Sequence, residues 1–186
     1  MIAEGQNRTP TLGGFEEVSD EGKHRGSAVF LMVVRYGLLL AAGLLAGALV
    51  GVWLLEHSFR GGGSFYTELK QLQISTFTAP LSLLGAGTVV LGLMYLFLVR
   101  GNRLAAGLAL AGVLCFVVSF VITVWGHFPI NARIVGWSVE APPEQWAQTA
   151  ADWRRAHDLR TLLGVLGFGL LLAGSLKSHR SREGKE

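Results

Sequence analysis

The chain has 186 residues, of which 51% are hydrophobic and only 16% carry a charge. This length suits a single domain, and the shortage of charged residues excludes an ordinary soluble globule. The formal net charge is only +3, so we expect no nucleic-acid partner. Cys115 is the single cysteine, which excludes a paired-thiol redox centre and suits a small packing residue.

The apolar residues are gathered into four nearly uncharged segments. A helix needs about 20 apolar residues to cross a hydrocarbon core about 30 Å thick. We therefore predict an all-α fold, an integral membrane four-helix bundle in contact with the lipid bilayer, with an extended outer loop and helix between spans three and four. The predicted spans are residues 30–55, 80–99, 104–126 and 159–176.

The segments that flank the spans are polar and predict the topology. Residues 1–26 are expected to be a disordered cytoplasmic N-terminus, followed by the membrane domain at 27–176 and a basic cytoplasmic tail at 177–186. Arg100 and Arg103 enclose a tight turn between spans two and three, as is typical of a cytoplasmic loop. We expect a multi-pass protein of the cell membrane with both termini in the cytoplasm, and the oligomeric state stays open.

The first outer loop is predicted at residues 56–79. It begins with a glycine hinge at 61–63, and Ser64 then starts a short helix. The apolar side of this helix is expected to comprise Tyr66, Leu69 and Leu72. Glu68 and Gln71 either point toward the mouth of the bundle or lie on the membrane surface.

The second outer loop carries most of the chemistry. Pro129 is expected to end the third helix, because proline cannot continue the hydrogen-bond ladder. Pro143 marks the start of a continuous helix at 143–176. Five residues of this helix follow one another at spacings of 4, 3, 4 and 3 and share an inward stripe: Trp146, Ala150, Trp153, His157 and Arg160.

Four motifs in this region resemble the anthrone oxygenase-like membrane family. They are P-x-N (Pro129, Asn131), Trp137, P-x-x-W (Pro143, Trp146) and W-x-x-x-H-x-x-R (Trp153, His157, Arg160). The resemblance covers roughly residues 30–176, with its specific part in the second outer loop and the start of the fourth helix. Fungal members of the family oxidise anthrones to anthraquinones with dioxygen and, as far as the family implies, without a bound cofactor.

The resemblance implies an oxygenase that acts on a flat aromatic or quinone-like hydrophobic molecule at the outer mouth of the bundle. His157 would be the base, since an imidazole titrates near neutral pH. Arg160 and Asn131 would stabilise the anion that forms, and Trp137 and Trp153 would stack on the aromatic rings. The remaining substrate-binding candidates are Trp146, His127, Glu68 and Gln71.

Two other interpretations stay open. Three histidines and a glutamate on the outer side could converge on a metal, although they lack a local ligand spacing such as H-x-x-x-H: His57, His127, His157 and Glu68. The protein could also be a non-enzymatic membrane protein that binds a lipid, a quinone-like ligand or a protein partner. The apolar spans one to three contain no ionisable residue at mid-bilayer, which argues against a transporter.

Overall fold

The computed structural model describes the backbone of residues 13–183 and the side-chain surroundings of residues 25–177. The chain divides into an N-terminal unit that ends at Val33 and a second unit that begins at Val34. The described part of the first unit belongs to helix α1, which spans Gly13–Ser58. Residues 13–26 are therefore helical where disorder is expected. The remainder of that prediction, residues 1–12, lies outside the described residues, as do the last three residues of the basic tail.

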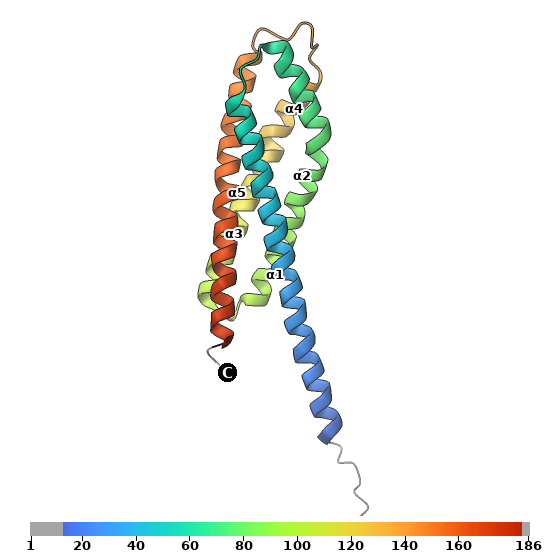
Figure 1. Cartoon of the computed structure of the whole chain (residues 1–186), viewed down its shortest axis with the longest axis vertical. Coiled ribbons are helices and arrows are strands. Elements are labelled where there is room, and N and C mark those ends of the chain that lie inside the picture. Colours follow the sequence, from blue (N-terminus) through green and yellow to red (C-terminus); the bar gives the residue numbers. More distant parts are fainter. Residues whose placement is uncertain (1–12, 184–186) are drawn as a thin grey trace, which may run out of the picture. The chain divides into compact units, whose positions relative to one another are not determined.

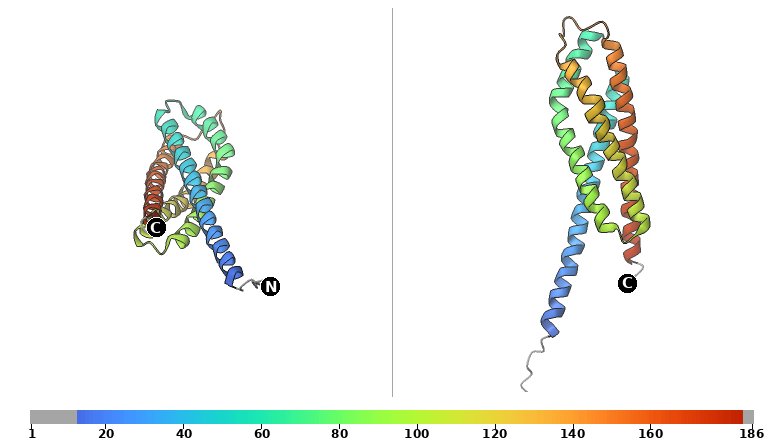
Figure 2. Two further views of the ribbon diagram at one scale, coloured as in Figure 1. Left: turned by 60° about the horizontal axis from the view of Figure 1, so that its bottom comes forward. Right: turned by 180° about the vertical axis from the view of Figure 1, so that it is seen from behind.

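The second unit is a bundle of four long helices (Figures 1 and 2). After α1 come α2 (Gly63–Val99), α3 (Arg103–Ile122) and α5 (Trp146–Glu183), and no strand occurs among residues 13–183. Four helical segments are long and apolar enough to cross a membrane: Arg25–Ser58, Gly63–Val99, Arg103–Val135 and Trp146–Lys177. Large apolar side chains such as Leu83 and Leu162 point outward, as lipid contact requires. The predicted all-α membrane bundle is confirmed.

Helix α2 is longer than the second predicted span and includes most of the first predicted outer loop. Pro80 lies inside it, where the missing N–H removes one hydrogen bond without ending the helix. The residues of the expected apolar face do not share one side of α2, because Tyr66 is 2% exposed whereas Leu72 is 64% exposed, and Lys70 and Gln73 are buried. A helix surrounded by lipid turns its polar side toward the other helices, the reverse of a helix lying on a membrane surface.

The third helix does not end at Pro129. A π-helical turn, η1 (Thr123–His127), follows α3 directly, and helix α4 (Phe128–Val135) follows that turn. The wider turn is visible in the bond from the Phe128 N–H to the carbonyl oxygen of Thr123, five residues earlier. Pro129 then falls in the first turn of α4, where a residue without an N–H is tolerated. The helical path therefore continues from Arg103 to Val135.

Residues 136–145 connect α4 to α5. The Ser138 hydroxyl donates a hydrogen bond of 2.7 Å to Glu140, which lowers the pKa of that carboxyl group. Helix α5 begins at Trp146, three residues after the predicted start, and the Trp146 N–H bonds to the Pro143 carbonyl oxygen at 2.9 Å. The predicted inward stripe of α5 is present, since Ala150, Trp153 and His157 are buried.

Glycines bring α3 and α5 into backbone contact. A Cβ atom on Gly112 would lie 2.8 Å from Leu171 Cγ and 2.9 Å from the carbonyl oxygen of Gly167. A Cβ atom on Gly167 would lie 3.1 Å from the carbonyl oxygen of Gly112. Backbone atoms cannot move aside as a flexible side chain can, so these two positions require glycine. Small residues serve this purpose widely in membrane helix pairs.

We expect Gly112→Val to lower the free energy of unfolding by about 1–3 kcal/mol, the usual cost of overpacking a tight contact. Gly107→Val is the matched control on the same helix, because a Cβ atom there meets nothing within 4 Å. Thermal unfolding in detergent micelles would measure both variants. Equal melting midpoints for the two would contradict the close approach of α3 and α5.

Candidate functional site

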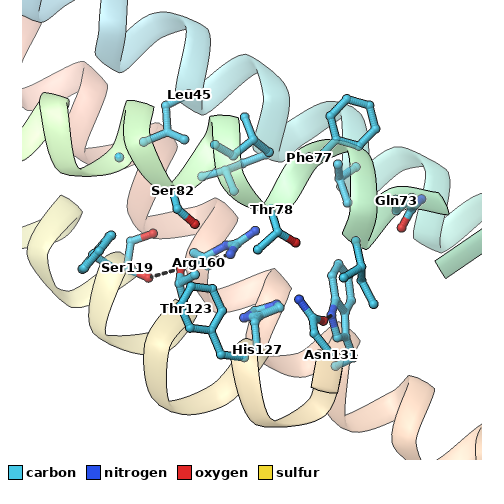
Figure 3. A pocket seen from close by; sticks show the side chains of 18 of the residues that line it. Leu45, Gln73, Phe77, Thr78, Ser82, Ser119, Thr123, His127, Asn131 and Arg160 are labelled. Atoms are coloured by element: carbon cyan, nitrogen blue, oxygen red, sulfur yellow. Dashed lines mark hydrogen bonds between the residues drawn. The ribbon is translucent and has the colours of Figure 1, made fainter. Parts of the chain in front are cut away.

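A cavity of about 90 Å³ lies inside the bundle (Figure 3). Residues of α2, among them Gln73, Phe77 and Thr78, face the cavity across from residues of α3, η1 and α4. Four of the residues expected at the site line its wall: His127, Asn131, Trp153 and Arg160. The cavity lies between the helices, deeper than the mouth at which the sequence places the site.

The indole of Trp153 is the centre of a cluster on this wall. Its N–H donates a 3.0 Å hydrogen bond to Asn131 Oδ1, and its ring stacks on His157 with the centroids 4.8 Å apart. His127 meets it edge-on at 4.8 Å, and Lys70 Nζ lies 3.0 Å from its centroid. A ring with these neighbours has little face left for a ligand, so Trp153 organises the wall. Asn131 accepts through Oδ1, which leaves its NH₂ group as a donor.

His157 is buried behind the cavity wall, with 1% of its surface exposed, and does not line the cavity. Its Nε2 lies 3.1 Å from the carbonyl oxygen of Leu49 on α1. A carbonyl only accepts, so Nε2 carries the proton and Nδ1 accepts the 3.3 Å bond from Arg160 Nη2. Both nitrogens are therefore occupied. With its Nδ1 bonded to Arg160 Nη2, His157 is placed to orient the guanidinium of Arg160.

Arg160 supplies a positive charge to the wall. Its Nη1 donates to Thr123 Oγ1 at 3.0 Å, and its buried Nε has no hydrogen-bond partner among the described side chains and backbone. Within the described part of the chain, no carboxylate forms an ion pair with this guanidinium. A guanidinium stays protonated in proteins. The cavity therefore borders a cation without a counterion in the part of the chain whose side chains are described.

His127 reaches the wall from the π-helical turn. It is 2% exposed, and neither of its ring nitrogens has a hydrogen-bond partner among the described residues. Residues of π-turns often lie at functional sites, because the extra residue changes the direction of the side chains that follow. In contrast to His157, His127 keeps a ring nitrogen available for a proton or a hydrogen bond.

A buried ion pair adjoins the cavity, and it was not among the candidates from sequence. Lys70 Nζ lies 2.7 Å from Glu56 Oε1, and the two side chains are 1% and 3% exposed. Lys70 lines the cavity together with Gln73, whose amide atoms have no hydrogen-bond partner in the described structure. The spacing of Tyr66, Lys70, Gln73 and Phe77 (4, 3 and 4) is a helical stripe that could have identified this face.

The other expected site residues do not line the cavity. Glu68 is exposed. Gln71 Nε2 donates to the carbonyl oxygens at the end of α4, those of Ile134, Val135 and Trp137, at 3.0–3.3 Å. Val135 is the last residue of α4, so Gln71 caps the C-terminal end of this helix. Trp137 and Trp146 pack against the apolar cluster of Tyr66, Ile130, Ile134, Ala150 and Trp153.

The histidines do not gather into a metal-ligand set with Glu68. His57 is exposed, and its Nε2 lies 3.6 Å from Asp158. The His127 and His157 rings are 5.9 Å apart, and His157 is held by Leu49 and Arg160. Between residues 25 and 177, no group of three or more histidine, cysteine, aspartate or glutamate residues is arranged to hold a metal ion.

We expect Glu56→Gln or Lys70→Met alone to lower the free energy of unfolding by about 3–5 kcal/mol, because either change leaves a buried charge without its partner. The double variant is expected to be closer to wild type than either single variant. A double-mutant cycle in detergent micelles would measure this coupling. Asp152→Asn is the control, since its partner Arg155 is 77% exposed. If the double variant lost as much stability as the two single variants together, this result would contradict the ion pair.

Comparison with known proteins places these residues in a family. Searches of curated proteins and of solved structures gave no match. The model of the anthrone oxygenase family matches residues 73–170, more than half of the chain. The matched range includes His127, Asn131, Trp153 and Arg160 and leaves out the Glu56–Lys70 pair. The chain is a multi-pass membrane protein that belongs to the anthrone oxygenase family.

Proposed function

We propose that this protein is an oxygenase that acts on a flat, hydrophobic aromatic ketone in the membrane. Dioxygen would convert a CH₂ group between aromatic rings into a carbonyl with the release of one water, so that CH₂ and O₂ become C=O and H₂O. The reaction, so written, needs no bound cofactor. The observation that carries this proposal is the cation of Arg160, which borders an otherwise largely apolar cavity and has no counterion among residues 25–177.

A buried cation without a counterion favours an anion at the same place. Removing a proton from the CH₂ group produces an enolate-like anion that can react with dioxygen. Among the apolar side chains of the bundle, Arg160 would attract the negative charge more strongly than it would in solution. The Asn131 NH₂ group, oriented by Trp153, is the second donor. Thr123 and His157 hold the guanidinium in place before any ligand arrives.

The base in this proposal is His127. It lines the cavity and has no competing hydrogen bond among the described residues, so a ring nitrogen can accept the proton from the CH₂ group. His157 cannot accept a proton on Nδ1 without losing its bond to Arg160. We therefore assign His157 a positioning role, in place of the role as base that the family resemblance implies.

The charge distribution of the chain supports a location in the cell membrane with both termini in the cytoplasm. Arg100 and Arg103 would then lie on the cytoplasmic side, at the end of the bundle opposite residues 136–145 (Figure 1). A hydrophobic substrate would reach the cavity from the lipid, where it concentrates.

We expect purified protein to oxidise anthrone to anthraquinone with uptake of oxygen. His127→Ala is expected to lower the rate by about 10²–10⁴, the usual contribution of a general base. An oxygen electrode and the absorbance of the product would measure this reaction. His57→Ala is the control, because His57 is exposed and does not line the cavity. A His127→Ala variant with the wild-type rate would rule out His127 as the base.

The same cation would also suit a protein that binds an anionic lipid or a reduced quinone without changing it. Turnover separates the two functions. If anthrone or a quinol raises the melting midpoint but no oxygen is consumed, the cavity is a binding site and the proposed oxygenase activity is wrong.

A further inference from the structure

We propose that the substrate enters the cavity from the side of the bundle, between α2 and the segment formed by η1 and α4, and that Phe77 and Phe128 control this entry. The proposal rests on the proposed function for the nature of the molecule that enters, a flat hydrophobic aromatic ketone. Its other support is the closure of the cavity in the remaining directions, the exposure of the two rings, and the interrupted hydrogen bonding of the helices beside them.

An apolar cluster closes the cavity toward the end of the bundle that carries residues 136–145. The buried side chains of Tyr66 on α2, Ile134 on α4 and Ala150 on α5 belong to this cluster. Each of them lies beyond the cavity-lining residues of its own helix, in the direction of that end (Figure 1). Trp146 packs against the cluster. The mouth that the sequence suggests at this end is therefore filled with side chains.

The cavity is also closed toward the opposite end of the bundle and along α1 and α5. A Cβ atom on Gly85 would lie 3.6 Å from Phe120 Cδ2 and 3.9 Å from Leu45 Cδ2, so α1, α2 and α3 are in ordinary contact at this level. Leu45 and Leu49 line the cavity from α1, and Trp153 lines it from α5. All three side chains are buried. The side that remains is the one between α2 and the segment of η1 and α4.

Phe77 of α2 and Phe128 of α4 lie between the cavity and the outside on this remaining side. Both line the cavity, yet 47% of Phe77 and 37% of Phe128 are exposed. The other described residues that line the cavity are buried or partly buried. Exposed neighbours on the same helical segments are large and apolar, as Leu83 and Trp125 are, so the outside here is lipid. The wall between cavity and lipid is thinnest at these two rings.

Phe77 and Phe128 lie at the same depth in the bundle. Gln71 Nε2 bonds to the carbonyl oxygen of Ile134 at 3.1 Å, which fixes the position of α2 relative to α4. The two helices run in opposite directions (Figure 1). Phe77 follows Gln71 by six residues and Phe128 precedes Ile134 by six, so each lies about 9 Å from this bond at about 1.5 Å per residue. The two residues therefore belong to opposite walls of one opening.

The backbone on both sides of this opening departs from regular α-helical hydrogen bonding. Pro80, three residues after Phe77, has no N–H, so the carbonyl oxygen of Thr76 has no α-helical donor. On the other wall, the π-helical turn that ends at His127 immediately precedes Phe128. Helices bend most readily at interruptions of this kind. A displacement of the two rings is thus least opposed where the cavity lies nearest to lipid.

The test measures how fast the cavity takes up anthraquinone, the product of the proposed reaction, which does not react with dioxygen. Protein in detergent micelles would be mixed rapidly with micelles that contain anthraquinone. Binding would be followed by the quenching of tryptophan fluorescence, since Trp153 lines the cavity. All proteins would carry Trp125→Phe, because Trp125 is 80% exposed and would be quenched from outside the cavity.

Phe77→Ala and Phe128→Ala are expected to raise the association rate constant about three- to tenfold, because entry that requires a conformational change is slow. Phe116→Ala is the matched control, since Phe116 lines the cavity but is buried. It should retain the wild-type association rate and dissociate faster. Trp146→Ala, which loosens the closed end of the bundle, should also retain the wild-type association rate. The association rate decides, because the loss of any ring that lines the cavity also changes the affinity.

Melting midpoints would show that each variant is folded, and a leucine would replace the alanine in any variant that is not. The proposal is overturned if neither Phe77→Ala nor Phe128→Ala accelerates association, or if Trp146→Ala or Phe116→Ala accelerates it equally. It is also overturned if anthraquinone does not bind to wild type, because no route to Trp153 would then exist. If anthraquinone binds but anthrone is not oxidised, the oxygenase activity fails, while the association rates still decide the route of entry.

Discussion

A polar side chain inside a bilayer must find its partner within the protein, because lipid offers no hydrogen bonds. A charge buried among helices has the same need, and this explains how α2 is oriented in the bundle. Lys70 points inward to Glu56 at 2.7 Å, while Leu72 and Leu83 point outward and are 64% and 74% exposed. Turning α2 so that Lys70 faced lipid would leave Glu56 as a buried charge without a partner, at a cost of several kcal/mol. The ion pair therefore holds one wall of the cavity in place.

The opposite wall depends on the π-helical turn between α3 and α4. The wider turn changes the direction of the residues around it, and both Thr123 and His127 reach the cavity. Thr123 accepts a hydrogen bond from Arg160, and His127 meets the edge of Trp153. Trp153 in turn contacts Lys70 of α2 and Asn131 of α4. The indole of Trp153 on α5 thus contacts α2, α4 and the π turn. A substitution of this ring would therefore disturb the packing of each of these elements.

Part of the candidate site could be predicted from the sequence because Trp153 and Arg160 lie on one regular helix. The spacing of Trp153, His157 and Arg160 identifies a stripe of α5, and this stripe does face the interior. The sequence does not predict the ion pair of Glu56 and Lys70, because both residues lie near a glycine hinge and among polar residues. Charged side chains in such a segment are usually exposed to water. The sequence also predicts that the third helix ends at Pro129, because no residue pattern identifies the π turn that lets the helix continue.

The sequence by itself determined that the chain is all-α and crosses a membrane four times, because solvation by lipid depends on composition and helical periodicity is local. Only the tertiary structure decided which histidine faces the cavity. His157 is on the predicted stripe, yet its Nε2 bonds to Leu49, 108 residues away, and its Nδ1 bonds to Arg160. His127 has no such partner among the described residues. Hydrogen-bond partners across helices depend on how each helix is rotated against its neighbours, and no local pattern in the sequence specifies that rotation.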